Sequence, residues 1–505
     1  MSGSGGGPDR AAFSGARALV VGLGTSGEAA ARVLAQLGAH VVAVDSRADV
    51  AARAAEALPG VTVLDADGDE TALAERALAT SPRLVVAGPG LAPSSPLLAV
   101  PRDAGLEIWS EVELAWRVRA DDAPWLTLTG TNGKTTTVEM LSSILTADGR
   151  LAPAVGNVGT PISAVALYGA PDAHGVVRPP DAYAVELSSF QLHHTFTVEP
   201  TASACLNISP DHLDWHGTFD AYRADKARVY ARTRAACVYS TWDPATRAMV
   251  EEADVAEGAR AIGARLGVPG LGEVGLVEDV IVDRAFHAAR HIEGVALAEA
   301  DDLAHLARPG IGVPVHVLQN ALVAAALARA AGVTPSAVAT GLRAYAPGAH
   351  RIEAVAVLDG VTYVDDSKAT NAHAASASLA ALEPGRGVWI AGGLAKGATF
   401  DELVAARSDR LRGVVLIGVD ATPWADALRR HAPEVPVIAV VPGETEDVMS
   451  AAVARARALA RPGDTVLLAP AGASHDQFAS YAARGDAFAA AVRALEGGRA
   501  GEVVP

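Results

Sequence analysis

Residues 129–136 read Thr-Gly-Thr-Asn-Gly-Lys-Thr-Thr, directly after the apolar stretch 125–128 and before a helical pattern. Gly130 and Gly133 allow the backbone to approach a polyphosphate closely, and the N–H groups at the start of the helix favour an anion. Lys134 supplies a mobile positive charge for the outer phosphates, and Thr135 supplies a hydroxyl for a magnesium ion. A strand, a glycine-rich loop and a helix in this order predict a nucleoside-triphosphate site.

The glycine spacing of this loop is tighter than in the usual phosphate-binding pattern, because Leu128 stands where the first glycine would be. We therefore expect a particular subtype of nucleoside-triphosphate site. The helix that follows has Val138, Leu141 and Leu145 on one side and is expected to stop at Gly149. The alternative is a glycine-rich turn with a solvated lysine.

The composition bounds the class of protein. The chain has 505 residues, which indicates three or four domains of about 150 residues each. A net charge of −17 and a pI near 5.3 argue against nucleic acid and anionic membranes as partners. Cys205 and Cys237 lack a metal-type spacing, and we expect Cys205 in the core. Neither a signal peptide nor a membrane span is evident, so we expect a soluble, cytoplasmic protein. We also expect a monomer.

Strand-like apolar runs alternate with Ala- and Leu-rich helical patterns along the chain, which is typical of α/β domains with mostly parallel sheets. We predict three domains: a Rossmann-like domain over 1–115, a central domain with the phosphate loop over 116–348, and a second Rossmann-like domain over 349–505. The stretch from about 243 to 312 is glycine-rich and poor in motifs, so we expect a divergent insertion or peripheral strands there.

The first block carries a second nucleotide-like pattern. Gly22, Gly24 and Gly27 follow a strand and open a helix, and Asp45 ends the next strand. This matches the dinucleotide fingerprint, in which the acid binds a ribose hydroxyl. Arg47 adds a cation for a phosphate or a ring edge. A tight strand–helix turn without a ligand is the alternative.

Further polar residues stand at predicted strand ends in the central block. Glu186 ends an apolar run that we place next to the phosphate loop, where it could hold magnesium directly or through water. Asp211 and His212 follow the next strand, and Tyr222 and Lys226 come shortly after. The alternatives are a solvated strand-end glutamate and an Asp–His pair that hydrogen-bonds locally.

The third block has three strands that end in polar, glycine-containing loops. These loops span 365–371, 392–397 and 470–478, and the first crowds acid, hydroxyl, amine and amide groups into seven residues. In an open α/β sheet such loops line one edge, where ligands bind. The alternative is a set of solvated loops.

Together these motifs resemble the Mur ligases, the ATP-dependent amide-bond ligases of peptidoglycan precursor synthesis. The phosphate loop is shared with the folylpolyglutamate synthases of the same superfamily, and the narrower motifs are similar to those of the D-glutamate-adding branch. The resemblance spans roughly residues 18 to 490 in order, and the Asp-Asn-Pro-Arg signature of the diaminopimelate- or lysine-adding branch is absent. The narrower motifs are Gly22-Leu-Gly24, Gly156-Asn157-Val-Gly159, Glu186-Leu-Ser-Ser-Phe-Gln-Leu192, Asp211-His212-Leu-Asp214, His350-Arg351-Ile-Glu353 and Asp366-Ser-Lys-Ala-Thr-Asn371.

The resemblance implies an activity and its residues. ATP would activate the carboxylate of UDP-N-acetylmuramoyl-L-alanine as an acyl phosphate, which the amine of D-glutamate attacks. Two Mg²⁺ sites are implied, with Lys226 carbamoylated, because a bare ammonium repels the metal whereas a carbamate supplies oxygens. Implied catalytic residues are Lys134, His212, Lys226 and Lys368. Implied ATP-binding residues are Gly130, Thr131, Asn132, Gly133, Lys134, Thr135, Thr136, Asn320, Arg351 and Asp366, and implied metal ligands are Thr135, Glu186, His212 and Lys226. Implied contacts to the UDP-linked substrate are Gly24, Ser26, Asp45, Arg47 and Asn157, and implied contacts to D-glutamate are Lys368, Thr370, Lys396, Ser474 and Tyr481.

Two positions depart from the pattern of the family. The family's His-Asn-x-x-Asn helix motif reads His316-Val317-Leu-Gln-Asn320, so any adenine or ribose contact of the first asparagine is missing. His316 and Asn320 are one helical turn apart and can share a face. Tyr481 stands where a phenylalanine is common and adds a hydroxyl near the implied D-glutamate site.

Three other functions remain open at this point. A folylpolyglutamate synthase would need a pterin pocket, and the glycine pattern at 22–27 argues against it. An NAD-dependent oxidoreductase would leave the phosphate loop and the loops of the third block unexplained. A catalytically inactive relative is opposed by the presence of Lys134, Glu186, His212, Lys226 and Lys368.

Overall fold

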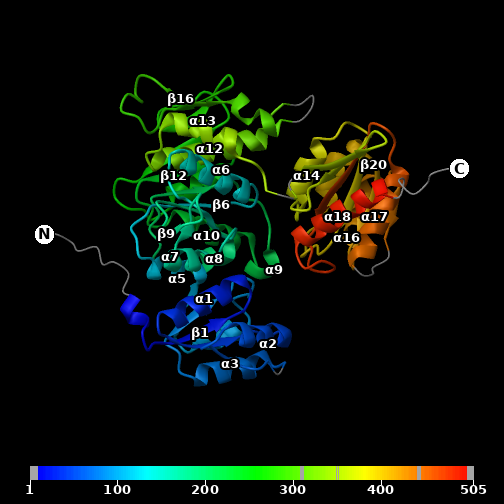
Figure 1. The fold of residues 1–505 in the computed structure, drawn as a ribbon. Helices are drawn as coiled ribbons and strands as arrows, with labels where there is room; N and C mark the ends of the chain where they lie inside the picture. The colour runs from blue at the N-terminus through cyan, green and yellow to red at the C-terminus, as the bar shows by residue number, and fades with distance from the viewer. Residues whose placement is uncertain are drawn as a thin grey trace. The chain divides into compact units, whose positions relative to one another are not determined.

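The computed structural model describes residues 10–66, 68–307, 312–348, 350, 352–440 and 445–497. These residues form three large sheets flanked by helices, as Figure 1 shows, which confirms the α/β class with three domains. By their internal contacts the residues group into two compact units. The first unit comprises Met1–Pro210 and Trp215–Tyr345, and the second comprises Asp211–Asp214 and Ala346–Pro505.

The first sheet of the first unit has five parallel strands in the order β3-β2-β1-β4-β5. Because the order reverses at β1, the carboxyl end of β1 is a topological switch point, where α/β sheets bind ligands. The strands are β1 (Arg17–Val21), β2 (His40–Val44), β3 (Thr62–Val63), β4 (Leu84–Ala87) and β5 (Ile108–Ser110). The helices are η1 (Arg10–Phe13), α1 (Thr25–Gln36), α2 (Ala48–Ala57), α3 (Glu70–Ala79), α4 (Pro96–Asp103) and α5 (Glu111–Val118).

Both faces of this sheet are covered, which explains why its strands are continuously apolar. On β1, Ala18 and Val20 pack in one core cluster with residues of α1 and α2. Leu19 and Val21, which point the other way, pack with residues of α3 and α4.

The second sheet of the first unit has nine strands in the order β16-β15-β14-β13-β12-β11-β6-β10-β7. The strands from β7 to β14 are parallel, and β15 and β16 close one edge antiparallel. The strands are β6 (Trp125–Thr129), β7 (Ala154–Gly156), β10 (Tyr183–Glu186), β11 (Ala202–Cys205), β12 (Ala236–Ser240), β13 (Arg260–Arg265), β14 (Glu273–Val277), β15 (Val280–Asp283) and β16 (Val295–Glu299), with a separate hairpin of β8 (Ala170–Pro171) and β9 (Val177–Arg178). The helices are α6 (Lys134–Ala147), α7 (Ile162–Tyr168), α8 (Ser189–His193), α9 (Leu213–His216), α10 (Phe219–Ala227), η2 (Arg228–Tyr230), α11 (Pro244–Glu251), η3 (Ala300–Leu306), α12 (Val315–Ala330) and α13 (Pro335–Ala344).

The motif-poor stretch from 243 to 312 supplies α11 and the outer strands β13 to β16, so the expectation of peripheral strands is confirmed for its described residues. The strand β6, which leads into the phosphate loop, lies inside the sheet between β10 and β11. Leu126 and Leu128 pack on one face with α6 and α12, and Trp125 packs on the other with α7.

Helix α5 packs against the cores of both sheets of the first unit. Leu114 and Val118 belong to the core of the first sheet, whereas Val112 and Trp116 belong to that of the second. Its first residue, Glu111, is 1% exposed and accepts a hydrogen bond from the Ser163 backbone N–H at the start of α7 (2.7 Å). The other carboxyl oxygen of Glu111 has no hydrogen-bond partner among the described residues, and burial raises its pKa to about 7.

The second unit holds a six-stranded sheet in the order β17-β18-β22-β19-β20-β21, parallel except for β17. Its strands are β17 (Glu353–Leu358), β18 (Val361–Asp365), β19 (Gly387–Gly392), β20 (Leu411–Ile417), β21 (Val437–Ala439) and β22 (Thr465–Ala471). Its helices are α14 (Ala372–Ala380), α15 (Asp401–Arg407), η4 (Ser408–Arg410), α16 (Thr422–His431), α17 (Thr445–Leu459) and α18 (Tyr481–Gly497). Two core clusters cover its two faces.

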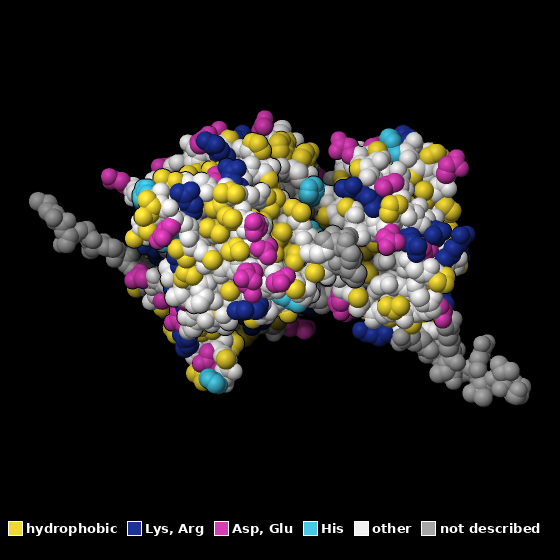
Figure 2. Space-filling model, turned by 90° about the horizontal axis from the view of Figure 1, so that it is seen from above, with side chains coloured by type: hydrophobic (Ala, Val, Ile, Leu, Met, Phe, Trp, Pro, Cys, Tyr) yellow, Lys and Arg dark blue, Asp and Glu magenta, His cyan; other side chains and the backbone are white. Residues whose placement is uncertain are grey.

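Across the described ranges, no helix is long and apolar enough to cross a membrane. On the face shown in Figure 2, Lys and Arg side chains are interspersed with Asp and Glu. Both cysteines are buried and unpaired, and burial raises the pKa of Cys205 to about 12, so Cys205 is a core residue as expected.

Candidate functional site

The phosphate loop, residues 129–136, follows β6 and turns into α6. Gly133 precedes the helix with a φ of +82°, a left-handed conformation that favours glycine. A Cβ at this position would lie 2.5 Å from the side-chain oxygen of Asn320, so the loop has room only for glycine there. No side chain caps the first turn of α6. The predicted strand–loop–helix arrangement is therefore present.

Contacts to the segment after β11 hold the loop in place. The backbone N–H of Thr131 donates to the carbonyl of Asn207 (3.0 Å). The side chain of Asn207 bonds Asn132 twice, accepting from its N–H (2.9 Å) and donating to its carbonyl (3.1 Å). Two neighbouring strand ends thus fix the loop's backbone.

Lys134 lies over its own loop. Its Nζ donates to the carbonyls of Gly130 and Thr131, both at 2.9 Å. Thr135 is buried in the first turn of α6, and Thr136 is half-buried beside it. The amine of Lys134 is therefore held at the mouth of the loop, where the outer phosphates of a nucleotide would lie.

Glu186 ends β10, the strand paired with β6, and it is 1% exposed. One carboxylate oxygen accepts from the side-chain N–H of Asn157 (2.8 Å). The other oxygen is buried without a hydrogen-bond partner among the described residues. The structure thus brings two predicted site residues together and leaves one anionic oxygen for a further ligand.

Lys226 is 2% exposed, and its Nζ contacts the phosphate loop. It donates to the Gly130 carbonyl (2.8 Å) and to the Thr129 hydroxyl (3.2 Å). The ring of Tyr222 lies 5.0 Å from the amine, and its hydroxyl bonds that of Thr131 (3.0 Å). Helix α10 therefore presents Lys226 to the phosphate loop.

His212 belongs to the second unit, apart from the unit that holds Glu186 and Lys226. It has a φ of +52°, and its backbone N–H donates to the side chain of Asp211 (3.0 Å). Asn320 is buried on α12, and Val317 on the same helix packs in the central core. Val317, which replaces the first asparagine of the family's helix motif, is therefore an apolar core residue.

The glycine-containing turn at residues 22–27 joins β1 to α1 as expected. Gly22 has a φ of +84°, and a Cβ on Gly27 would lie 1.8 Å from the Gly22 carbonyl oxygen. Gly24 lines an open pocket of about 440 Å³, and Ser26 is half-buried on α1. Glycines therefore allow α1 to start against β1.

Asp45 is 3% exposed and joins the loop after β1 to the end of β2. Its carboxylate accepts from the Leu23 backbone N–H (2.8 Å) and from the guanidinium of Arg47 twice, both at 3.0 Å. Burial raises the pKa of Asp45, but the hydrogen bonds from Arg47 and Leu23 outweigh it and hold that pKa below its usual value. The two residues predicted to bind the nucleotide thus form an ion pair.

In the second unit, Asp366 and Lys368 follow β18. The Asp366 carboxylate accepts from the Ser378 hydroxyl on α14. The ammonium of Lys368 lies 3.9 Å from the centre of the Tyr481 ring, a cation–π contact. Ser367 between them donates its hydroxyl to the Tyr481 carbonyl (2.7 Å). This unit therefore brings together Lys368 and Tyr481, two of the predicted site residues.

The remaining predicted residues of this unit lie in its other loops. Ser474 is 2% exposed after β22, Lys396 is exposed with a φ of +48°, and Thr370 is half-buried. Arg351 lies outside the described residues.

Arg484 was missed from the sequence. Its side chain is fully buried near the start of α18 and donates to both the hydroxyl and the carbonyl of Ser367 (3.0 and 2.9 Å). A third bond reaches the Gly472 carbonyl (3.1 Å), so Arg484 ties the loops after β18 and β22 together. Burial lowers its pKa to about 10. No local motif marks this arginine, because its partners are more than ten residues away.

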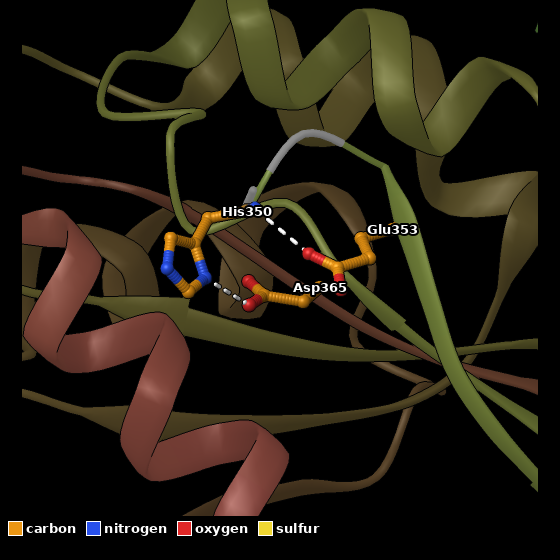
Figure 3. A group of neighbouring side chains, drawn as sticks. All are labelled: His350, Glu353 and Asp365. Atoms are coloured by element: carbon orange, nitrogen blue, oxygen red, sulfur yellow. Dashed lines mark hydrogen bonds and ion pairs between the residues drawn. The ribbon is translucent and has the colours of Figure 1, made fainter. Parts of the chain in front are cut away.

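Figure 3 shows a cluster at the start of the second unit. His350 Nδ1 pairs with Asp365 (2.7 Å), and the His350 backbone N–H donates to Glu353 (3.0 Å). The ligand-type atoms of these three residues lie within 4.8 Å of one another. Because the His350 carbonyl also accepts from the Lys368 backbone (3.3 Å), the cluster anchors the loop that carries Lys368.

The chain contains four lysines in all: Lys134, Lys226, Lys368 and Lys396. Each of the four is a predicted site residue. The chain has 41 Lys and Arg residues in total, and all the others are arginines.

Comparisons with known proteins agree with this arrangement. Three family models match in order: the Mur ligase MurD-like N-terminal domain over residues 16–110, the Mur ligase middle domain over 128–267, and the Mur ligase glutamate ligase domain over 350–472. A UDP-N-acetylmuramoylalanine–D-glutamate ligase of Streptomyces avermitilis is 53% identical and covers 96% of this chain and 99% of its own length. The enzyme of the same name from Thermobifida fusca is 50% identical with the same coverage.

Solved structures support the fold. A murein peptide ligase of Psychrobacter arcticus matches with a TM-score of 0.54 at 16% identity, covering 97% of this chain and 100% of its own. UDP-N-acetylmuramate–alanine ligase of Thermotoga maritima matches with a TM-score of 0.52 at 16% identity, covering 96% and 100%. The three matched domains and the full-length relatives confirm the resemblance seen in the motifs, and this chain belongs to the Mur ligase family.

Proposed function

We propose that this chain is the ATP-dependent ligase that adds D-glutamate to UDP-N-acetylmuramoyl-L-alanine in peptidoglycan precursor synthesis. The observation that carries this proposal is its 53% identity, along nearly the whole length of both chains, to an enzyme named for that activity. The phosphate loop and the buried Glu186 give the chain the groups that such a reaction needs.

We assign one binding task to each domain. Residues 1–115 bind the UDP-linked substrate, residues 116–348 bind ATP, and residues 349–505 bind the amino acid. Helix α5 crosses the first of these boundaries and packs in the cores of both neighbouring sheets. The protein acts as a monomer, and because the reaction consumes ATP and a nucleotide-linked precursor we place it in the cytoplasm.

ATP lies on the phosphate loop in this proposal. The backbone of residues 130–136 and the start of α6 surround the phosphates. Lys134 exchanges its two carbonyl partners for phosphate oxygens, because an anion is a stronger acceptor than a neutral carbonyl. Asn320, Arg351 and Asp366 complete the ATP contacts.

The residues around Glu186 fit a magnesium ion. Its unpartnered, buried carboxylate oxygen is the kind of hard ligand that Mg²⁺ prefers, and burial of an unpaired carboxylate is otherwise costly. We assign Thr135 and Glu186 to one ion and His212 with Lys226 to a second. Bound there, magnesium would neutralise charge that develops on the transferred phosphoryl group.

Lys226 fits the second ion only after carbamoylation. As an ammonium it donates to Gly130 and Thr129 and would repel a cation, whereas a carbamate would supply oxygen ligands. We expect Lys226→Ala to lose activity and to regain part of it with added short carboxylates. Absence of rescue in a variant with an unchanged circular dichroism spectrum would contradict the carbamate role.

The UDP-linked substrate occupies the edge of the first sheet. We assign Gly24, Ser26, Asp45 and Arg47 to its nucleotide and Asn157 to its sugar-linked part. The Asp45–Arg47 pair holds the acid ionised, which suits an acceptor of ribose hydroxyls.

D-glutamate carries two carboxylates, which require cations and N–H donors. We assign Lys368, Thr370, Lys396, Ser474 and Tyr481 to this substrate. The L-alanine carboxylate of the UDP-linked substrate attacks the γ-phosphorus of ATP, and ADP leaves. The amine of D-glutamate then attacks the acyl phosphate, expels phosphate and gives up a proton as the amide forms. Lys134 and Lys368 stabilise the negative charge that develops in these steps, and His212 and Lys226 contribute through the ion that they would hold.

The test is phosphate release from ATP with UDP-N-acetylmuramoyl-L-alanine, comparing D-glutamate, L-glutamate, L-alanine and meso-diaminopimelate. Release that requires both the UDP-linked substrate and D-glutamate is the expected result. Release with a different amino acid would keep the mechanism and change the substrate. No release with any of them would overturn the proposal.

A further inference from the structure

His216, the last residue of α9, lies between the segment that carries Glu186 and the helix that carries Lys226. Its Nε2 is 2.9 Å from the hydroxyl of Ser189, which opens α8 three residues after Glu186. Its Nδ1 is 3.0 Å from a carboxylate oxygen of Asp225, the neighbour of Lys226 on α10. One imidazole therefore bridges two elements that carry predicted site residues.

Chemistry fixes the direction of the hydrogen bond to Asp225. The carboxylate of Asp225 can only accept, so Nδ1 of His216 donates to it. The other nitrogen shares a hydrogen bond with the Ser189 hydroxyl, which can act as donor or acceptor. Asp225 has two other partners, His193 (2.9 Å) and Arg228 (3.5 Å). Their side chains are 31% and 41% exposed, whereas that of His216 is 1% exposed, so His216 is the buried partner of Asp225.

The ring of His216 is also packed by other aromatic rings. Phe190 stacks on it at 5.6 Å between centroids, with an angle of 19° between the planes. Tyr222 meets it edge-on at 5.2 Å, and Trp215 lies 4.4 Å away. With both nitrogens bonded and these neighbours in contact, the imidazole has one orientation.

Asp225 and Lys226 are consecutive residues of α10. Successive side chains on a helix point about 100° apart, so holding Asp225 on one side also sets the direction of Lys226. The Nζ of Lys226 must reach the Gly130 carbonyl at 2.8 Å from a position that is 2% exposed. A rotation of α10 would break this contact and that of Tyr222 with Thr131.

The order Ser189–His216–Asp225 is also that of a nucleophilic triad. Ser189 is 3% exposed, however, so a substrate has no approach to its hydroxyl. We propose instead that His216 is a positioning residue for Lys226, holding α10 so that the lysine amine meets the phosphate loop. This inference rests on the proposed role of Lys226 in the ligase.

The four lysines provide a direct test, because amine-reactive labelling followed by mass spectrometry reports on each of them. In the wild-type chain we expect Lys226 to label slowly. In His216→Phe we expect Lys226 to label at least about tenfold faster while Lys134, Lys368 and Lys396 keep their rates. We also expect kcat to fall by about 10- to 100-fold, the usual effect of removing such a supporting contact, with smaller changes in KM.

The matched control is His431→Phe, which removes another His–Asp contact, with Asp401 at 2.9 Å, in the second unit. It should leave both labelling and turnover unchanged. Asp225→Asn preserves the shape of the side chain, and it should also speed Lys226 labelling. If His216→Phe does not fold, the labelling rate of Lys226 in Asp225→Asn decides the test.

Two results would overturn the inference. One is a Lys226 labelling rate within about twofold of wild type in both variants. The other is faster labelling of all four lysines together with a lower melting temperature, which would mean a general structural role. Wild-type turnover by Lys226→Ala would instead contradict the proposed function, and the labelling rates would still decide whether His216 positions the lysine.

Discussion

At the scale of single residues, the amines near the phosphate loop contact its neutral carbonyls. Lys134 and Lys226 both donate to carbonyls of the loop. Glu186 has one oxygen on the Asn157 amide and one that lacks a hydrogen-bond partner among the described residues. A phosphate oxygen is a stronger acceptor than a neutral carbonyl, so an anion can replace these carbonyls as the partner of an amine.

Lys134→Ala tests the phosphate loop directly. We expect kcat to fall by about 100- to 1,000-fold or more, because the charge that stabilises phosphoryl transfer is removed. The measurement is the D-glutamate-dependent release of phosphate. Turnover within about twofold of wild type would show that the loop does not bind the reacting phosphates.

Glu111 gives a pH-dependent prediction. Burial raises its pKa from 4.5 to about 7 in the folded chain, so the fold favours the protonated form. Stability therefore falls as pH rises from about 4.5 through about 7, and above that range the loss is on the order of 3 kcal/mol. Glu111→Gln removes this titration and keeps an acceptor for the Ser163 N–H.

We thus expect the melting temperature of Glu111→Gln, relative to wild type, to be higher at pH 8 than at pH 5. The comparison across pH cancels any constant effect of the new amide. If the melting temperature of Glu111→Gln differs from that of wild type by the same amount at pH 5 and pH 8, Glu111 titrates as an ordinary glutamate.

At the scale of elements, the sequence predicted features that depend on neighbours along the chain. Three of these features combine a strand, a glycine or an acid, and a helix within a few residues. They are the phosphate loop, the turn at Gly22–Gly27 and the polar loop after β18. The assignment of Lys368 and Tyr481 to one substrate came from the resemblance to the family and not from spacing.

Features that depend on distant partners were not predicted. Arg484 bonds Ser367 across 117 residues, and Glu111 bonds Ser163 across 52. His216 was read as part of no motif, although it joins Ser189 and Asp225. Residue types at such positions are common on any surface, so only the folded chain distinguishes them.

The glycines at the two ends of α6, Gly133 and Gly149, allow a prediction with a matched control. Gly133 before the helix and Gly149 after it have φ values of +82° and +83°. Alanine at either position should cost about 1–2 kcal/mol from backbone strain. Only Gly133→Ala adds a clash, with the Asn320 side chain, whereas nothing lies within 4 Å of a Cβ at Gly149.

We therefore expect Gly133→Ala to lose ATP binding, measured by calorimetry, and Gly149→Ala to retain it with a similarly lowered melting temperature. Equal ATP affinity in the two variants would mean that the close approach of Asn320 to the loop is unimportant for the nucleotide.

At the scale of the whole molecule, each hydrophobic core closes within one unit. The four clusters of the first unit span residues 13–345, and the two clusters of the second unit span residues 361–492. A segment with its own core can fold alone. Within the first unit, by contrast, α5 contributes to the cores of two sheets.

We expect residues 1–345 and 346–505 to fold when they are produced as separate chains, each with a cooperative thermal transition. A chain of residues 1–115 alone should be less stable than the intact first sheet, because it ends inside α5, lacks Val118 and removes the partners of α5 in the core of the second sheet. Circular dichroism melting of the three chains is the measurement. A non-cooperative transition in either of the first two would show that the units depend on each other.

The four lysines divide the basic side chains of this molecule by their chemistry. Arginine occupies every other basic position, including those on the surface. A guanidinium keeps its charge but is planar, bulky and unable to lose its proton, whereas an amine is compact and can become a nucleophile. Exchange of lysine for arginine at positions 134, 226, 368 and 396, one at a time, would therefore separate the need for a positive charge from the need for a compact amine.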